Sequence, residues 1–574
     1  MDDQTGGAAA PRHELAIVGG GIAGLMLASA MARNGVKVLV LESGVHPKFA
    51  IGESMILETS EIMRSLAMVF DTPELEYFSA EHFTPVIGGS HGVKRHFSYI
   101  PHRDDTEFNP ADIVQAVIPK RPYGHELHLY RQDSDYFYLS TAVKYGATVL
   151  QKQTVVDIDI RENGVSLKTA AGEEFEADYV IDAGGFRSLV AEKFALRRRD
   201  LRTHTRGLFT HMVGVRSLHE REPSPRDLGV PFSFAEGTLH HVFEGGWIWV
   251  IPFNNHREAT NDLCSVGLLL DPRIHGPSSN ETPQEEFDRI AARFPSVSRH
   301  LEGARPVRDW VRADRLQYAS TEVVGDRWCL LGHAAGFIDP LFSKGLYTSL
   351  ASVLAFGRAF LKAREQKTYT RKAFAEVERV TLSYVASNDR LVANAIKSFA
   401  HADLWRVYSV IWILGAYLEL VRLTTYRQSL SKRCRTRDER LAFTPPELRL
   451  VGGGFPAFDA LSDEVDRTIE ALDMSDPRAV QSAVDAIRAR ILKETWIPHA
   501  HRAIARGARA LPRRKFSWRL FMQDGGVMGR RDFRDHFFAD TSLPALATFM
   551  MRERFRYSRQ AIGMRHRKTR ALDI

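Results

Sequence analysis

The sequence predicts an α/β protein with a parallel sheet, an antiparallel sheet and a mainly helical C-terminal region. A strand–helix–strand pattern with a glycine turn opens the chain, alternating apolar segments fill its middle, and helical spacing of apolar residues follows residue 390. The 574 residues are 44% hydrophobic and 26% charged, as in an ordinary globular protein. A chain of this length is expected to form two or more packing units.

The first element is a dinucleotide-binding turn within segment 12–60. Gly19, Gly21 and Gly24 occupy the positions of a GxGxxG motif between a strand and a helix, and Glu42 ends the next strand. The first glycine permits the tight turn, the second lets a pyrophosphate approach the backbone, and the third lets helix and strand pack closely. The acid is placed to accept hydrogen bonds from ribose hydroxyls. The unit therefore predicts dinucleotide binding.

Segments 125–200 and 320–365 identify the kind of nucleotide. In each, an apolar strand runs into small residues, as at Asp182, Ala183 and Gly184. Three such segments spread along one chain are the layout of glutathione-reductase-like proteins that bind FAD. The sequence therefore predicts a glutathione-reductase-like FAD-binding fold with a parallel Rossmann sheet.

Between these segments, 80–120 and 203–318 alternate in the way expected of an antiparallel sheet on the substrate side. Within it, "GGWIWVIPF" places Trp247 and Trp249 on one face of a strand that Pro252 ends. Core packing and a functional wall are both compatible with such a pair.

Four motifs give the chain a specific resemblance. They are WxWxIP at Trp247, Trp249, Ile251 and Pro252; FxxPxxSxG at Phe337, Pro340, Ser343 and Gly345; GES at Gly52, Glu53 and Ser54; and the pair Arg131 and Asp135. Over about the first 390 residues the chain resembles the flavin-dependent halogenases of the FAD-dependent monooxygenase superfamily. Phe342 resembles the branch that acts on phenols and pyrroles. We accordingly divide the chain into an FAD-binding domain, 1–390, and a helical region, 391–574.

The resemblance implies an enzyme that uses reduced FAD, oxygen and chloride or bromide to make hypohalous acid. This oxidant reaches a separately bound aromatic substrate through a tunnel, along which the tryptophan pair lies and near whose end a lysine relays it. The backbone around Ser343 would hold the halide. The expected catalytic residues are Lys94, Glu53, Ser343, Lys344, Gly345, Trp247 and Trp249. The expected FAD-binding residues are Gly19, Gly21, Ile22, Ala23, Gly24, Glu42, Ser43, Ser54, Arg131, Val155, Asp182, Ala183, Gly184, His333, Phe337, Pro340, Gly345 and Leu346.

Several residues depart from the family pattern. Lys94 follows GES later than the family lysine does, and an exposed charge on an edge strand is the alternative. Without that lysine the scaffold would serve as a monooxygenase, desaturase or reductase. Lys344 replaces a serine or threonine and either strengthens anion binding or points to solvent. His333 replaces an aspartate and still offers a hydrogen bond to a ribityl hydroxyl, and Glu53 is the carboxylate expected to assist substrate deprotonation.

Composition limits partners and location. The three cysteines lack any pairing pattern, the N-terminus lacks signal-peptide order, and the apolar run 407–418 is short for a membrane span, so we expect a cytoplasmic protein. A separate flavin reductase is expected because only one nucleotide-binding unit is complete. The basic C-terminal end, including Arg513, Arg514 and Lys515, would suit an acidic carrier protein holding the substrate. Neither nucleic acid nor a metal is expected, and His499 and His501 read as core or surface residues. A non-catalytic FAD-binding protein is the remaining alternative.

Overall fold

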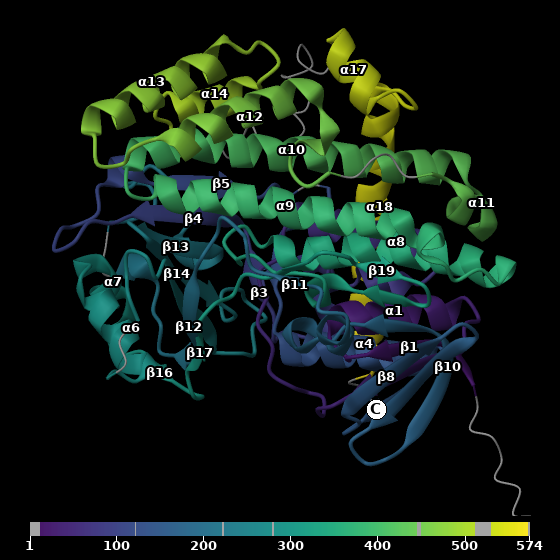
Figure 1. Ribbon diagram of the computed structural model, residues 1–574. Helices are drawn as coiled ribbons and strands as arrows, with labels where there is room; N and C mark the ends of the chain where they lie inside the picture. The colour runs from purple at the N-terminus through teal and green to yellow at the C-terminus, as the bar shows by residue number, and fades with distance from the viewer. Residues whose placement is uncertain are drawn as a thin grey trace, which may run out of the picture.

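A parallel sheet assembled from distant parts of the chain forms the base of the molecule (Figure 1). The computed structural model describes residues 12–571, apart from 121, 221–222, 278–279, 445–448 and 511–529. The parallel strands follow the order β20-β10-β1-β2-β7. Their bounds are Trp328–Leu330, Glu174–Asp182, His13–Val18, Val38–Glu42 and Thr148–Gln151. The apolar runs of the inner strands are buried because the strands are covered on both faces.

Short strands extend this sheet, and helices cover it. β19 (Val324–Gly325) pairs with β20, while the hairpin of β8 (Val155–Arg161) and β9 (Gly164–Thr169) adds to β10. The helix α1 that follows the glycine turn packs against α4 and α8. The helices of this part are α1 (Ile22–Arg33), α2 (Leu57–Val69), α3 (Thr84–Ile87), α4 (Arg131–Lys144), α5 (Leu189–Lys193) and α8 (Lys344–Gln366).

The second sheet has the order β16-β12-β15-β14-β13-β4-β5, with β17 also paired to β12. Its strands, in chain order, are β4 (His96–Pro101), β5 (Val114–Val117), β12 (Arg206–Val213), β13 (Thr238–Phe243), β14 (Gly246–Pro252), β15 (Cys264–Leu270), β16 (Arg305–Pro306) and β17 (Val311–Ala313). The expectation of a wholly antiparallel sheet is wrong at one place, because β4 and β13 run parallel. One face packs into the main core, and the other forms a smaller core with α6 (Pro283–Ala292) and α7 (Pro295–Leu301).

Two small pairings complete the strands. β3 (Gly92–Lys94) pairs antiparallel with β6 (Glu126–His128), and β11 (Arg197–Arg198) pairs with β18 (Ala319–Ser320). The first of them lies beside the GES segment, because Ser54 forms a bridge with His128.

The long helices α9 (Ala375–Ser398) and α10 (Ala402–Arg433) lie across the two sheets (Figure 1). The helices that follow are α11 (Arg437–Ala442), α12 (Pro456–Ala471), α13 (Pro477–Lys493), α14 (His499–Ala505), α17 (Arg531–Phe537) and α18 (Leu543–Ala571). The domain boundary predicted at residue 390 lies inside the continuous α9, so a division before residue 375 follows the backbone better. α10 is long and apolar enough to cross a membrane, yet 78% of its apolar window is buried inside the protein.

A buried cluster of charges joins α2, α10 and α18. Arg427 binds Glu61 (2.8 Å) and Glu553, and Arg64 binds Glu61 (3.0 Å) and Tyr557 (3.2 Å). Glu553 and Tyr557 of the C-terminal α18 are thus packed into the core. The residues Arg513, Arg514 and Lys515 lie outside the described residues.

Candidate active site

The glycine turn after β1 fits the phosphates of a dinucleotide. Gly19 has φ +106°, and a Cβ on Gly24 would lie 2.5 Å from the carbonyl oxygen of Gly19, so neither position has room for a side chain. A Cβ on Gly21 would meet nothing within 4 Å, which leaves open space beside the start of α1. Glu42 accepts hydrogen bonds from Gly20 N (2.7 Å) and Gly44 N (2.7 Å). It also forms an ion pair with Lys48. These residues fit the adenosine end of FAD.

The other predicted FAD residues gather around the carboxyl ends of the same strands. Ser43 follows β2, Val155 begins β8, and Ala183 and Gly184 follow β10. Arg131 opens α4, pairs with Asp135 (2.8 Å) and donates to the carbonyl of Ile51 (2.5 Å). Ile22, Ala23 and Leu346 lie at the starts of α1 and α8.

Two predicted FAD residues have particular surroundings. The carboxylate of Asp182 is turned inward, where it accepts from Gly184 N, Ser188 Oγ (2.7 Å) and Val190 N. His333 is half-buried and packs edge-on against Phe337, and desolvation lowers the pKa of its ring to about 4. A neutral imidazole retains one donor and one acceptor, which suits the predicted bond to a hydroxyl.

The tryptophan pair lies in the middle of the second sheet. Trp247 and Trp249 are 1% and 5% exposed, their rings are 5.6 Å apart, and both face the core shared with the FAD-binding part. Trp249 lies over the cross-strand Gly267, where a Cβ would come within 2.2 Å of the indole. Trp249 Nε1 donates to Ser265 Oγ (3.1 Å). The rings form one wall between the sheet and the FAD-binding part.

Lys94 is placed beside the GES segment by the pairing of β3 with β6. Its Nζ donates to Ser54 Oγ (2.6 Å) and the Met55 carbonyl (2.8 Å) and lies 3.2 Å from the centre of the Phe97 ring. The alternative of an exposed edge-strand charge is wrong, because the side chain is fully buried. Burial lowers the pKa of Lys94 well below its usual range, which favours the neutral amine.

The FxxPxxSxG segment forms a strained turn into α8. Ser343 is the N-cap residue of this 23-residue helix and has a φ of +55°. This left-handed conformation is uncommon for a residue other than glycine. A Cβ on Gly345 would lie 2.9 Å from His333 Nε2, so a glycine is needed there for close packing. The alternative that Lys344 points to solvent is wrong, because its Nζ is buried against Glu58 (2.6 Å) and Glu419 (3.2 Å). Although burial lowers it, these carboxylates raise the pKa of Lys344 overall.

An aromatic cavity lies next to Lys94 and Lys344. Its walls come from the start of α2, β4, β5, the start of α8, α10 and α14, and include Phe97, Phe342 and Trp412. Trp412 packs on Phe342 (4.7 Å between centroids) and on Phe97 (5.3 Å). Tyr99 and His240 continue this aromatic packing from Trp412 to Trp247. The tryptophan pair and the cavity therefore belong to one aromatic assembly.

The carboxylate in the cavity wall is Glu58, not Glu53. Glu53 is buried against His211 Nε2 (2.6 Å) and is not among the described residues that line the cavity. Glu58, in the first turn of α2, lines it together with Lys344 and His501. Glu58 is not among the predicted site residues, and His501 is predicted to be a core or surface residue. Neither carries a motif, since their positions follow from how α2 and α14 pack.

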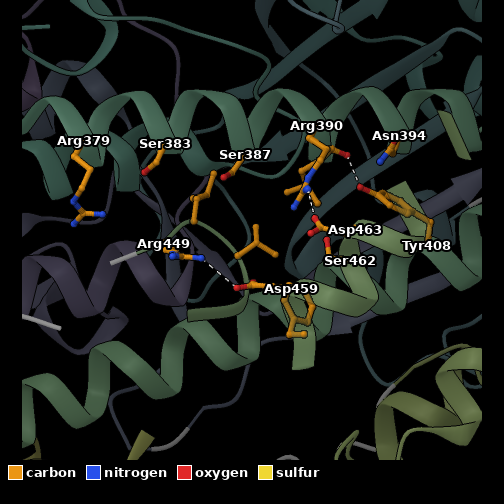
Figure 2. Close-up of a pocket in the computed structure, with 14 residues that line it drawn as sticks. Arg379, Ser383, Ser387, Arg390, Asn394, Tyr408, Arg449, Asp459, Ser462 and Asp463 are labelled. Atoms are coloured by element: carbon orange, nitrogen blue, oxygen red, sulfur yellow. Dashed lines mark hydrogen bonds and ion pairs between the residues drawn. The ribbon is translucent and has the colours of Figure 1, made fainter. Parts of the chain in front are cut away.

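A second hollow lies between α9 and α12 and is polar. Figure 2 shows Arg379, Ser383, Ser387 and Arg390 along one helix, facing Asp463 on another. Arg390 pairs with Asp463 (2.5 Å), and Arg449 pairs with Asp459 (3.3 Å). Its charges are thus balanced within the protein, and the apolar cavity beside Lys94 is the better match for an aromatic ring.

Comparison with known proteins gives a consistent set of similarities. The family model described as tryptophan halogenase matches residues 116–387, and the one described as pyridine nucleotide-disulphide oxidoreductase matches residues 13–193. The chain is 38% identical over 474 residues to the monodechloroaminopyrrolnitrin halogenase PrnC of Pseudomonas fluorescens, covering 82% of this chain and 83% of that protein. It is 36% identical over 490 residues to the tetracycline 7-halogenase of Kitasatospora aureofaciens, covering 84% and 87%.

A solved structure agrees with these relatives. The crystal structure of halogenase PltM in complex with phloroglucinol and FAD superimposes with a TM-score of 0.83 at 32% identity, covering 87% of this chain and 99% of that one.

Proposed function

The chain belongs to the flavin-dependent halogenase family, and we propose that it halogenates an electron-rich aromatic compound with reduced FAD supplied by a separate flavin reductase. It is an FAD-dependent oxidoreductase that uses FAD and halide. The single observation that best supports the aromatic substrate is the cavity of Phe97, Phe342 and Trp412 next to the buried Lys94. We propose that the reaction takes place in the cytoplasm, in secondary metabolism.

FAD would be held by the glycine turn, Glu42 and the residues at the carboxyl ends of the parallel strands. When bound, FAD supplies the electrons that convert oxygen and halide into a halogenating agent. Arg131 is fixed by Asp135 and would present a charged group to the cofactor from the start of α4. The backbone N–H groups of Lys344 and Gly345, in the first turn of α8, would bind the halide, because a long helix favours an anion at this end. The N–H of Ser343 donates to the Pro340 carbonyl (2.8 Å) instead.

Lys94 would hold the halogenating agent at the edge of the cavity. A neutral amine is a hydrogen-bond donor and a nucleophile, and burial favours this form of Lys94. Its Nζ lies over the face of Phe97, whose ring lines the cavity, so a halogen held there would be near a substrate. Trp247 and Trp249 would keep the substrate away from the flavin side.

The alternative of a monooxygenase, desaturase or reductase rested on the missing lysine. Lys94 is adjacent to Ser54 of the GES segment in space, which removes that reason.

For the substrate class we propose a phenol or pyrrole. A relative that is 24% identical is a 1H-pyrrole-2-carbonyl-[peptidyl-carrier protein] chlorinase, and PltM was crystallised with phloroglucinol. The substrate is free or bound to an acidic carrier protein, which is the proposed partner.

Anaerobic flavin reduction tests the two-component proposal. The purified protein is mixed with FAD and excess NADH or NADPH, with and without a flavin reductase, and the FAD absorbance is followed. We expect bleaching only with the reductase, and halogenated product by mass spectrometry after oxygen, bromide and a phenol are added. Rapid bleaching by NAD(P)H alone would contradict the proposal and indicate a self-sufficient oxidoreductase.

A further inference from the structure

The aromatic cavity contains two polar side chains with unused hydrogen-bonding capacity. Oε1 of Glu58 accepts from Lys344 Nζ (2.6 Å), whereas no hydrogen bond reaches its Oε2 within the described part of the chain. His501 is fully buried, and neither ring nitrogen has a hydrogen-bond partner among the described residues. Buried polar groups without partners are uncommon in folded proteins because their desolvation is not compensated.

Oε2 of Glu58 is a hydrogen-bond acceptor that no side chain of the described residues uses. Lys344 is held between Glu58 and Glu419, and these two carboxylates keep it charged in spite of its burial. The ammonium group of Lys344 forms a charge-assisted hydrogen bond of 2.6 Å with Glu58 Oε1. An ionised carboxylate only accepts hydrogen bonds, so Oε2 requires a ligand group that donates, such as a phenolic O–H, an aniline N–H or a pyrrole N–H.

His501 offers a second and different polar contact. It comes from α14, in the helical region, and its ring lies 5.5 Å from that of Tyr417, which also lines the cavity. Burial lowers the pKa of His501 to about 4, so the ring is neutral at pH 7. A neutral imidazole has one donor and one acceptor nitrogen and can bond to either a hydroxyl or a carbonyl.

We propose that the cavity recognises an aromatic ring that carries two polar groups, one an O–H or N–H that donates to Glu58 Oε2 and the other bonded to His501. The apolar walls of Phe97, Phe342 and Trp412 would hold the ring between them. The role of this cavity in halogenation rests on the proposed function. The binding of such a ring does not.

Glu58 would also accept the substrate proton during halogenation. For a phenol and hypohalous acid, the ring carbon bonds to the halogen, the halogen–oxygen bond breaks, and the phenolic proton passes to Glu58, which leaves a cyclohexadienone and hydroxide. The hydroxide then removes the ring C–H proton and becomes water, while Glu58 returns its proton to the oxygen. The sum is phenol plus hypohalous acid to halophenol plus water, and Glu58 is regenerated.

Binding of resorcinol and its two methyl ethers to the FAD-loaded full chain tests the proposal without halide or reductase. The monomethyl ether retains one O–H donor and the dimethyl ether retains none. We expect wild type to bind resorcinol about tenfold more tightly than the dimethyl ether by calorimetry, because a hydrogen bond to a charged group is lost. Glu58→Gln should reduce this preference, and His501→Leu should weaken resorcinol binding, whereas His499→Leu, at an exposed position on the same helix, should not.

Turnover then separates recognition from proton transfer. With bromide and reduced FAD, Glu58→Gln should lower kcat for resorcinol by a larger factor than kcat for the dimethyl ether, which has no phenolic proton to transfer. Equal affinity of wild type for all three compounds, or no binding at millimolar concentration, would overturn the inference. Selective binding without any brominated product would instead count against the proposed function and leave the recognition site intact.

Discussion

Replacement of Arg427 by methionine is expected to destabilise the protein by about 3 kcal/mol. Arg427 is fully buried and ties α10 to α2 through Glu61 and to α18 through Glu553. The cluster that these residues form contains three carboxylates (Glu61, Glu76, Glu553) and three guanidinium groups (Arg64, Arg427, Arg556), so it is neutral. Methionine fills much of the space but leaves a net charge of −1 in a buried site.

The magnitude follows from the partners that remain. Breaking a buried ion pair costs about 3–5 kcal/mol when the surviving charge is left uncompensated. Here Glu61 keeps Arg64 at 3.0 Å and Glu553 keeps Arg556 at 3.1 Å, so the lower end of that range applies. With a urea m-value of about 3 kcal/mol/M, the loss lowers the unfolding midpoint by about 1 M.

The pH dependence provides a second test. Burial by itself raises the pKa of Glu61, but Arg427 and Arg64 outweigh it and lower that pKa below the unfolded value. The stability gained from ionised Glu61 is therefore present above the unfolded pKa and is lost as the pH falls through the folded pKa. Without Arg427, Glu61 takes up a proton more readily, so the difference between variant and wild type should shrink toward acid pH.

Urea unfolding followed by tryptophan fluorescence measures the effect. Arg433→Met is the matched control, since Arg433 lies on the same helix in a half-exposed pair with Asp540 and should contribute at most about 1 kcal/mol. Equal midpoint shifts for the two variants, or a penalty for Arg427→Met that grows toward acid pH, would refute the reasoning.

Three further predictions concern the site. Gly267→Ala would press a Cβ to within 2.2 Å of Trp249 and should cost about 1–3 kcal/mol in the same unfolding assay, whereas Gly276→Ala, with nothing within 4 Å, should not; equal effects would contradict the close packing. Gly21→Ala should weaken FAD binding about tenfold in a fluorescence titration and leave the circular dichroism spectrum unchanged; unaltered affinity would place the pyrophosphate elsewhere. Lys94→Met should lower halogenated product at least about 100-fold, measured by mass spectrometry, while oxidation of reduced FAD continues; loss of both activities would argue against a role limited to the halogenating agent.

The features that depend on local backbone geometry could be located from the sequence. The GxGxxG turn needs particular glycines and the tryptophan pair needs alternation, so both are visible in a short stretch. The position of Lys94 could not be read from its spacing, because short helices such as α3 take up the residues between α2 and β3. Glu58 and His501 come together only through the packing of α2 and α14 around one cavity, and no pattern in either segment indicates that contact.

The wide separation of the partners in the charge cluster has a consequence for how the chain is made. Glu61 emerges from the ribosome 366 residues before Arg427, and Arg64 emerges 493 residues before Tyr557. At a translation rate of about 5–20 residues per second, the second interval lasts roughly 25 to 100 s. Until Arg427 is made, Arg64 on the same helix is the only guanidinium of the cluster that can pair with Glu61. The N-terminal part of the protein therefore cannot complete its core while it is being translated, and final closure must await release of nearly the whole chain.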